Sequence, residues 1–471
     1  MLPGLPRSFD RPLRIAIVGA GPAGFYTAAA LLAQAGPASA SEPRDRLQID
    51  LIDRLPTPYG LVRFGVAPDH PKIKEVVRVF ERVALDPRVR FLGGVELGRD
   101  LAVADLTAHY DQVVFSVGGQ SDRRLGVPGE DLAGSHSSTA LVAWYSAHPD
   151  FLDLPVDLAV EAAAVVGAGN VAVDVARILG RNPEDLASTD ICDDALACLR
   201  QSRIRDVHFI IRRGPAQAKW SPPELKELAH LQGVDVVVDR RELELDPGSE
   251  QELLEDPQAQ KNMEILRALA ERESTGAPRR IHLRFRVSPV AIAGEDGRVT
   301  GLGLERNRLV GAAGDVRAEG TGERFTLPVG LVVRAVGYRS LPLAGVPFDD
   351  RRAIIPNDRG RVLDGPAGSP LPGLYAAGWV KRGPTGLIGS NKPDGTETAT
   401  MMIEDLPALV AAPKPPIDEL LAARELHPVD FAGWKRLDQL EVERGRAAGR
   451  PRVKFARIEE MRAALATEPV L

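Results

Sequence analysis

A glycine-rich stretch near the start of the chain has the spacing of a site for nucleotide phosphates. Gly19, Gly21 and Gly24 follow an apolar run that predicts a strand over 14–18. In a Gly-x-Gly-x-x-Gly pattern the first glycine permits a tight turn, the second lets the backbone approach a pyrophosphate, and the third allows close helix packing. The helix that follows, expected over 25–35, offers N–H groups and partial positive charge to the phosphates. The stretch therefore predicts a dinucleotide site.

An acidic residue follows where a ribose would lie. Asp53 ends a second expected strand, 47–53, and its carboxylate can accept hydrogen bonds from a ribose diol. Its separation from Gly19 exceeds the usual spacing of about 20 residues, and a polar loop over 37–46 accounts for the excess. The plainer alternative is a solvated carboxylate at a strand end. A lone glycine motif is weak evidence, but strand, turn, helix and acid together favour the nucleotide site.

A second glycine pattern, Gly167-x-Gly169-x-x-Ala172, is followed by the opposite charge. Alanine in the third place is an accepted variant. The next expected strand, 207–212, leads into the pair Arg212-Arg213. Guanidinium groups pair with a 2′-phosphate, whereas a carboxylate there would repel it. This site is therefore predicted to take NADP(H), the alternative being that the two arginines are only a solvated basic pair.

Two adjacent dinucleotide sites imply hydride transfer between two cofactors. One cofactor must carry the nicotinamide, and FAD is the most economical choice for the other because a flavin can pass electrons on singly. The chain has two cysteines, Cys192 and Cys198, and no Cys-x-x-Cys pair. That count excludes a four-cysteine metal or iron–sulfur centre and disfavours a disulfide mechanism. Redox chemistry must therefore come from bound cofactors.

The elements that position these residues repeat along the chain. Strand, glycine turn and helix occur twice, the second helix being expected over 173–179, which argues for an α/β chain with parallel sheets. Two similar apolar strands, 113–119 and 331–337, bracket the second copy, and a last apolar strand is expected over 373–377. We predict two Rossmann-like dinucleotide-binding domains, with the NADP domain inserted into the FAD domain. The expected FAD domain comprises residues 1–119 and 339–471, including a C-terminal extension, and the NADP domain comprises 120–338.

Composition narrows the functional class further. The chain has 44% hydrophobic and 26% charged residues, with a net charge of −6. These values are typical of a globular protein and disfavour a nucleic-acid partner. The uncharged run 15–36 has the length of a membrane span, but its glycines and Pro22 would break a spanning helix. We therefore expect a cytoplasmic protein with no membrane span.

Longer motifs make the chain resemble a specific family. They are LRQSR (199–203), LVRFGVAPDHP (61–71), GAGNVAVDVARIL (167–179), RRGP (212–215), ELKE (224–227) and GWVKRGPTG (378–386). With these motifs the chain resembles the adrenodoxin reductase family of ferredoxin–NADP reductases, including its actinobacterial form. The resemblance spans roughly residues 12–405.

The resemblance implies which residues contact each cofactor. For FAD these are Ala23, Asp53, Leu61, Val95, Trp379, Gly386, Leu387 and Ile388, beside the glycines of the first turn. For NADPH these are Arg123, Gly167, Gly169, Asn170, Val171, Ala172, Arg212, Arg213, Glu224 and Gly386. Trp379 would meet the flavin ring, the alternative being that it packs in the core. Asp53 stands where the family often has glutamate.

Catalysis in such an enzyme rests mainly on geometry, because a hydride passes directly from nicotinamide to flavin. The resemblance makes Asp69, His70 and Glu227 candidates for a proton relay, with histidine as the group that titrates near neutral pH. The alternative for His70 is a structural role in a tight turn before Pro71.

The implied electron acceptor is a small acidic iron–sulfur protein of the ferredoxin type. Because the chain is itself acidic, docking would require a local basic patch. The candidates are Arg200, Arg203, Arg205 and Lys226. The resemblance suggests a monomer or weak dimer. Two alternatives stay open: an electron-input subunit like the small subunit of glutamate synthase, disfavoured because no cysteine-rich segment is present, and a scaffold that holds FAD without turnover.

Overall fold

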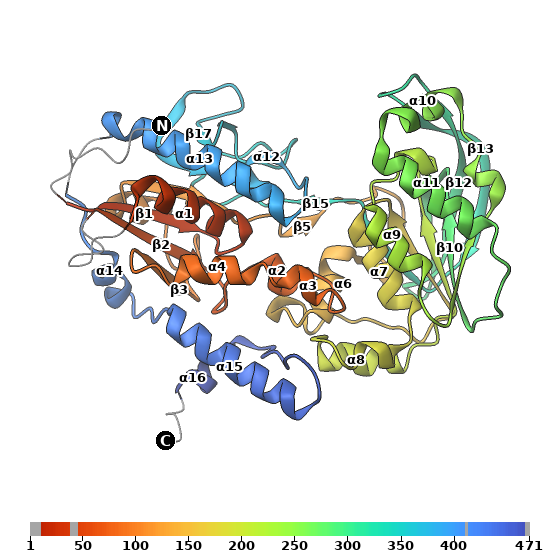
Figure 1. Ribbon diagram of the computed structural model, residues 1–471, viewed down its shortest axis with the longest axis horizontal. Helices are drawn as coiled ribbons and strands as arrows, with labels where there is room; N and C mark the ends of the chain where they lie inside the picture. Colours follow the sequence, from red (N-terminus) through yellow and green to blue (C-terminus); the bar gives the residue numbers. More distant parts are fainter. Residues whose placement is uncertain (1–10, 38–45, 410–412, 467–471) are drawn as a thin grey trace. The chain divides into compact units, whose positions relative to one another are not determined.

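The computed structural model describes residues 11–37, 46–409 and 413–466. The chain forms two compact units: unit 1 runs up to Ser121 and resumes at Tyr338, and unit 2 is Asp122–Gly337 (Figure 1). These boundaries lie within two residues of the expected ones. The chain crosses between the units through two short strands that pair with each other, β5 (Ser121–Asp122) and β15 (Tyr338–Arg339). Most of the loop expected over 37–46 lies outside the described residues.

Unit 1 is built on a seven-stranded sheet in the order β16-β17-β18-β4-β1-β2-β3. Five of its strands are parallel neighbours, and β17 and β16 add an antiparallel edge. The strands are β1 (Leu13–Val18), β2 (Leu47–Asp53), β3 (Val89–Gly93), β4 (Gln112–Phe115), β16 (Asn357–Asp358), β17 (Arg361–Leu363) and β18 (Pro370–Ala376). The central strands are apolar on both faces, as parallel strands covered on both sides require.

Helices cover both faces of this sheet. One face packs on α1 (Pro22–Ala35), α4 (Val77–Ala84), α13 (Asn391–Asp405) and α15 (Phe431–Ala447). The other packs on α5 (Val103–His109) and α14 (Ile417–Ala423). The short helices α2 (Leu61–Phe64), α3 (Pro71–Lys74) and α12 (Trp379–Arg382), with α16 (Ile458–Ala466), complete the unit. The C-terminal residues thus belong to the core of unit 1.

Unit 2 contains a six-stranded, wholly parallel sheet in the order β6-β14-β7-β8-β10-β9. The strands are β6 (Ser135–Ser137), β7 (Ala162–Gly167), β8 (Asp206–Ile210), β9 (Val234–Val238), β10 (Arg279–Arg284) and β14 (Leu331–Ala335). Its helices are α6 (Ser138–Tyr145), α7 (Asn170–Gly180), α8 (Asp193–Arg200), α9 (Pro222–Ala229), α10 (Pro247–Glu255) and α11 (Pro257–Ala270). The α/β fold class predicted from the sequence is confirmed.

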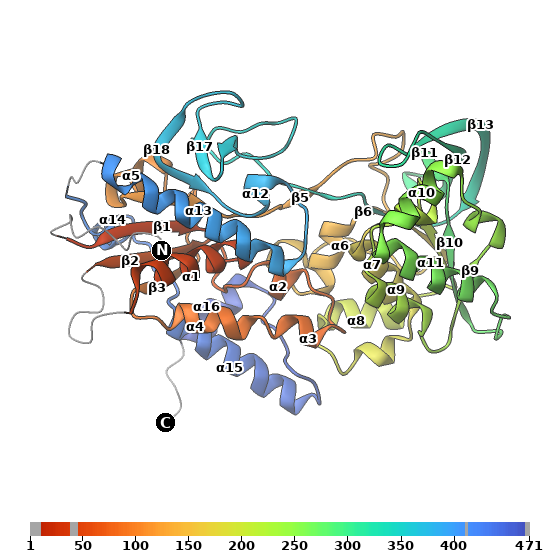
Figure 2. The same ribbon diagram turned by 45° about the horizontal axis from the view of Figure 1, so that its top comes forward.

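An antiparallel sheet of three strands, which the sequence analysis did not anticipate, adds to unit 2. Its strands are β11 (Val287–Glu295), β12 (Arg298–Val310) and β13 (Arg317–Pro328) (Figure 2). Apolar side chains of β12, among them Leu302 and Leu304, share a core with β7 and β14. The added sheet therefore covers part of one face of the parallel sheet.

The two units repeat one arrangement of strands. The order β4-β1-β2-β3 in unit 1 corresponds to β14-β7-β8-β10 in unit 2. The corresponding strands β4 and β14 overlap the similar segments 113–119 and 331–337, and each ends earlier than expected because the glycine lies in the loop beyond. Among the described residues, no helix combines the length and the apolar character that crossing a membrane requires.

Candidate functional site

The first glycine turn is built as a cradle at the carboxyl end of β1. Gly19 has φ +108°, its N–H donates to the Ile52 carbonyl at 2.7 Å, and a Cβ there would lie 2.6 Å from the Ser116 carbonyl oxygen. A Cβ on Gly24 would collide with the Gly19 carbonyl. A Cβ on Gly21, by contrast, would meet nothing within 4 Å. Packing therefore dictates Gly19 and Gly24, whereas the space beside Gly21 remains for a ligand.

The second turn reproduces this division. A Cβ on Gly167 would collide with the carbonyl of Ala335, the residue on β14 that corresponds to Ser116. A Cβ on Gly169 would meet nothing within 4 Å. Ala172, in the third place, is fully buried. The open position thus falls on the middle glycine in both units.

Each open position lies at the N-terminus of a long helix. Gly21 is the N-cap of α1 and Gly169 that of α7, and neither helix has a side chain capping its first N–H groups. Uncapped N–H groups and the helix dipole attract an anion. The two cradles therefore fit the pyrophosphate groups of two dinucleotides.

Asp53 stands at the carboxyl end of β2, as the strand expected over 47–53 predicts. Its carboxylate accepts hydrogen bonds from the Ala20 N–H at 2.8 Å and the Leu55 N–H at 3.0 Å. Burial raises the pKa of this carboxyl, and the backbone donors oppose that rise. Asp53 thus holds the first turn in place through both of its carboxylate oxygens.

Two further candidates flank this turn. Leu61 begins α2 and is half-buried, just after Tyr59, whose N–H donates to the Ala20 carbonyl at 2.7 Å. Val95 follows β3, and its N–H donates to the Asp53 carbonyl at 3.0 Å. The Val95 side chain is 2% exposed in the core, so only its backbone is available to a ligand.

The last candidates of unit 1 lie after β18. A Cβ on Gly378 would lie 2.5 Å from the Cβ of Ala23, so this loop closes directly on α1. Trp379 is half-buried; its indole N–H donates to the Thr385 carbonyl at 3.2 Å, and its ring lies 4.9 Å from that of Tyr338. Trp379 is therefore not a core residue. Tyr338 was not predicted from the sequence, where its place directly after Val336 and Gly337 is the only signal for it.

The loop 386–388 presents an open surface. Gly386 is exposed, Leu387 is 67% exposed and Ile388 is half-buried. An exposed leucine can make an apolar contact with a flat ring, and the neighbouring glycine lets such a ring approach the backbone closely.

In unit 2 the arginine pair follows β8. The strand ends at Ile210, two residues earlier than expected, so both arginines lie in the loop before Gly214 and Pro215. Their carbonyls are anchored: Arg212 accepts from Asn307 Nδ2 at 2.8 Å and Arg213 from the Arg286 N–H at 3.0 Å. Within the described part of the chain, neither guanidinium has an ion-pair partner. A loop whose backbone is anchored and whose two guanidinium groups have no ion-pair partner in the described structure is suited to binding a phosphate group.

Other candidates surround the second turn. The Asn170 side-chain oxygen accepts from the Ser221 N–H at 2.8 Å, which ties the start of α7 to the start of α9. Val171 is half-buried in the first turn of α7. Arg123 is exposed, and its N–H donates to the Gly337 carbonyl at 2.9 Å.

A buried cation that the sequence analysis missed orients the acidic candidates. Arg177 on α7 is 1% exposed and lies 2.8 Å from Asp174, 3.3 Å from Glu224 and 3.6 Å from Glu227. A buried charge requires such partners. Glu224 and Glu227 are therefore held on the α7 side of α9.

The family follows from comparison with known proteins. A model of the pyridine nucleotide-disulphide oxidoreductases matches residues 13–402. This chain belongs to that family. The NADPH-ferredoxin reductase FprA of Mycobacterium tuberculosis is 45% identical over 461 residues, covering 96% of this chain and 98% of the relative. The mitochondrial NADPH:adrenodoxin oxidoreductase of Arabidopsis thaliana is 40% identical, covering 97% and 96%. The solved structure of M. tuberculosis FprA in complex with NADPH matches with a TM-score of 0.90 at 44% identity, covering 97% and 100%.

The disulphide in the family description has no counterpart in this oxidoreductase. Cys192 and Cys198 are both free thiols in unit 2. Burial raises the pKa of each thiol, and Cys198 also donates to the Val156 carbonyl at 3.6 Å. A thiol with a raised pKa is a poor nucleophile. The redox step therefore does not use a cysteine pair.

The relay candidates are divided between the units of this family member. His70 is buried, precedes Pro71 and α3, and its N–H donates to the Ala67 carbonyl at 3.1 Å. Asp69 is half-buried beside it. Both belong to unit 1, whereas Glu227 belongs to unit 2.

The four basic candidates for docking differ in how they are paired. Arg200 lies 2.8 Å from Glu184, and Arg203 lies 3.7 Å from Glu161. Arg205 and Lys226 are exposed. Nearby acids offset the charge of the first two, so the patch is less basic than its sequence suggests.

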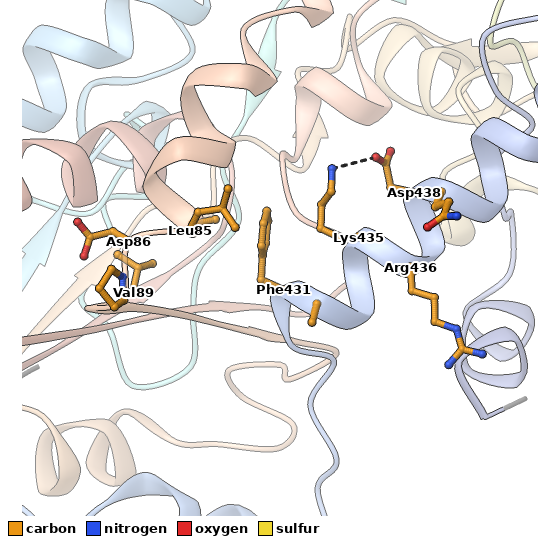
Figure 3. Close-up of a pocket in the computed structure, with 11 residues that line it drawn as sticks. Leu85, Asp86, Val89, Phe431, Lys435, Arg436 and Asp438 are labelled. Atoms are coloured by element: carbon orange, nitrogen blue, oxygen red, sulfur yellow. Dashed lines mark hydrogen bonds and ion pairs between the residues drawn. The ribbon is translucent and has the colours of Figure 1, made fainter. Parts of the chain in front are cut away.

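An open groove of about 840 Å³ in unit 1 lies away from the dinucleotide turn. It runs between the α4–β3 connection and α15, lined by Leu85, Val89 and Phe431 among others (Figure 3). Val89 begins β3, whereas Asp53 pairs with Gly93 at the opposite, carboxyl end of the sheet. The groove is therefore not the dinucleotide site.

Proposed function

We propose that this protein is an NADPH–ferredoxin reductase that moves electrons from NADPH through FAD to a ferredoxin-type iron–sulfur protein. The observation that carries the proposal is the pair of matched phosphate cradles, one completed by the Asp53 carboxylate and the other by the Arg212-Arg213 cations. The family membership and the full-length similarity to NADPH-ferredoxin reductases support it. FAD, when bound, supplies the conversion of a two-electron hydride into single electrons.

Unit 1 would hold the FAD. Gly21 and the uncapped N–H groups of α1 would receive its pyrophosphate, and Asp53 would accept from the ribose. Trp379 and the loop 386–388 would contact the ring system, with Ala23 beside the Gly378 turn. Leu61 and the Val95 backbone would complete the adenosine side.

Unit 2 would hold the NADPH. The turn Gly169–Ala172 would receive the pyrophosphate, and Arg212 and Arg213 would pair with the 2′-phosphate. Arg123, Glu224 and Gly386 would complete its contacts. Asp69, His70 and Glu227 would serve proton exchange, since imidazole and carboxylate groups can both give and accept a proton.

Ferredoxin would dock weakly and by charge, as electron-transfer partners do. Of the proposed patch, Arg205 and Lys226 contribute most, because acids already face Arg200 and Arg203. The double substitution of Arg205 and Lys226 by glutamate should raise the KM for ferredoxin at low salt and leave ferricyanide reduction unchanged. An unchanged ferredoxin KM would clear the patch. We further propose a monomer or weak dimer working in the cytoplasm, where NADPH is available.

An anaerobic absorbance titration of the purified protein, first with NADPH and then with NADH, tests the proposal. We expect flavin bands that bleach with about one equivalent of NADPH and only sluggishly with NADH, followed by reoxidation on adding ferredoxin. Bands that neither nucleotide bleaches would overturn the reductase proposal and leave a protein that holds FAD without turnover.

A further inference from the structure

The segment that lies on the first phosphate turn has a strained backbone. Tyr59 has φ +84° and Gly60 φ +48°, and a Cβ on Gly60 would lie 3.2 Å from the Gly21 Cα. A positive φ is costly for a residue as large as tyrosine. Such strain persists only where the surroundings over-determine it, and it concentrates at functional sites. Contacts with other parts of the chain must therefore hold Tyr59 and the adjoining α2 against the first glycine turn.

One restraint comes from α15, nearly four hundred residues later in the chain. The Trp434 ring meets the Tyr59 ring edge-on, with 5.8 Å between the ring centroids. Phe25 of α1 lies on the tyrosine as well, at 5.5 Å between ring centroids. Tyr59 is thus enclosed between α1 and α15 and is 6% exposed.

A second restraint is a buried ion pair made by Arg63, two residues after Leu61 on α2. The Arg63 guanidinium donates to both carboxylate oxygens of Glu441, at 2.8 and 2.5 Å, and the two side chains are 4% and 0% exposed. The same guanidinium lies 5.1 Å from the centre of the Trp434 ring. A bidentate pair of this kind fixes orientation as well as distance.

The segment after α15 completes the environment of this pair. Glu441 also accepts from the Phe455 N–H at 2.9 Å and from Arg452 at 3.3 Å. Lys454 donates to the Arg63 carbonyl at 3.1 Å. Removing one member of a buried ion pair leaves the charge of the other uncompensated, which costs far more than breaking an exposed pair.

These restraints come from residues beyond the part of the chain that the family model matches, 13–402. In both views α15 runs beside α4 (Figure 1, Figure 2), and Lys435 of α15 pairs with Glu81 of α4 at 2.7 Å. We infer that α15 and residues 452–455 form a clamp in which Trp434 and Glu441, through Tyr59 and Arg63, position the strained segment 59–64 for FAD binding. Glu441 and Trp434 are positioning residues; the inference rests on the proposed function, because it assigns the clamped segment to the flavin.

The test compares Glu441→Gln with Asp50→Asn in the full-length protein as purified. Asp50 is a matched control: it is also buried and ion-paired, to Arg90 at 2.8 Å, but it lies mid-strand on β2. Hydrogen exchange followed by mass spectrometry reports the amides of residues 59–64, and flavin fluorescence on dilution reports FAD release. We expect Glu441→Gln to speed both exchange in 59–64 and FAD release at least tenfold over Asp50→Asn, with the KM for NADPH unchanged.

Any result other than the expected one contradicts either the clamp or the proposed reductase function. Equal exchange in 59–64 for the two variants, or faster exchange without faster FAD release, would overturn the clamp. If Glu441→Gln does not fold, Trp434→Leu removes the ring contacts with Tyr59 and Arg63 and should change both readouts in the same direction; no change would also overturn the clamp. A wild-type protein without FAD would instead overturn the proposed function, and this result is read before any variant is made.

Discussion

Replacing Arg212 and Arg213 together by alanine should weaken NADPH binding selectively. Their carbonyls stay anchored by Asn307 and by the Arg286 N–H, so the loop should keep its shape when the side chains are removed. A sheltered charge-assisted hydrogen bond contributes about 1.5–3 kcal/mol. Because Arg212 is exposed and Arg213 half-buried, we take about 1 and 1.5 kcal/mol, respectively, after allowing for solvent screening. The sum of about 2.5 kcal/mol corresponds to roughly 60-fold in Kd.

Stopped-flow reduction of the flavin under anaerobic conditions gives the Kd for NADPH and for NADH separately. We expect the loss for NADPH to be roughly 60-fold and that for NADH to be small, because NADH has no 2′-phosphate. Arg267→Ala, which removes an exposed cation of the same unit on α11, is the control and should change neither value. Equal losses for the two nucleotides would refute the assignment of the pair to the 2′-phosphate.

Four further substitutions test the glycine turn and Asp53 of unit 1 and the buried His208 of unit 2. Gly21→Ala should change the free energy of unfolding of the FAD-free protein by no more than about 0.5 kcal/mol and should lower FAD affinity at least tenfold. Gly19→Ala should lower the stability of the protein itself, because its Cβ would collide with the Ser116 carbonyl. Equal shifts in melting temperature for the two variants would contradict this difference between the two glycines. Asp53→Asn turns an amide N–H toward one of the two backbone donors, Ala20 or Leu55, so FAD affinity should fall by about 1–3 kcal/mol in calorimetric titration; unchanged affinity would argue against the role of Asp53. Burial and nearby cations lower the pKa of His208 from 6.5 to about 3. Between these two pH values the unfolded chain therefore binds more protons at this position than the folded protein does. The free energy of unfolding should fall as the pH falls through this window. The slope is at most about 1.4 kcal/mol per pH unit, and urea unfolding of His208→Gln should show a flatter dependence; an unchanged slope would contradict the burial argument.

Much of the fold was predictable because it depends on short-range patterns. The strand 47–53 matches β2, and the helices expected over 25–35 and 173–179 lie within α1 and α7. The ends of elements were less certain: β8 stops at Ile210 because the chain turns there toward Gly214 and Pro215. The antiparallel strands β11–β13 were missed because their faces are only partly covered, so their hydrophobic pattern is weak.

The candidate site divides in the same way. The glycine turns, Asp53 and the arginine pair could be proposed from the sequence because each lies close to the end of a recognisable strand or the start of a recognisable helix. Arg177 could not be found, because a lone arginine within a helix has the same appearance whether it is solvated or buried among three acids. Tyr338 likewise could not be predicted as a site residue, because only its contact with the ring of Trp379 places it there.

By itself the sequence determined the two nucleotide cradles and the sign of the charge after each, since these depend on residue types at close spacing. Only the tertiary structure decided which middle glycines have open space, which cations are unpaired, and that Glu441 reaches Arg63. The physical reason is that burial and ion pairing are properties of groups brought together from distant parts of the chain. No local pattern encodes a contact between residues that lie 378 positions apart.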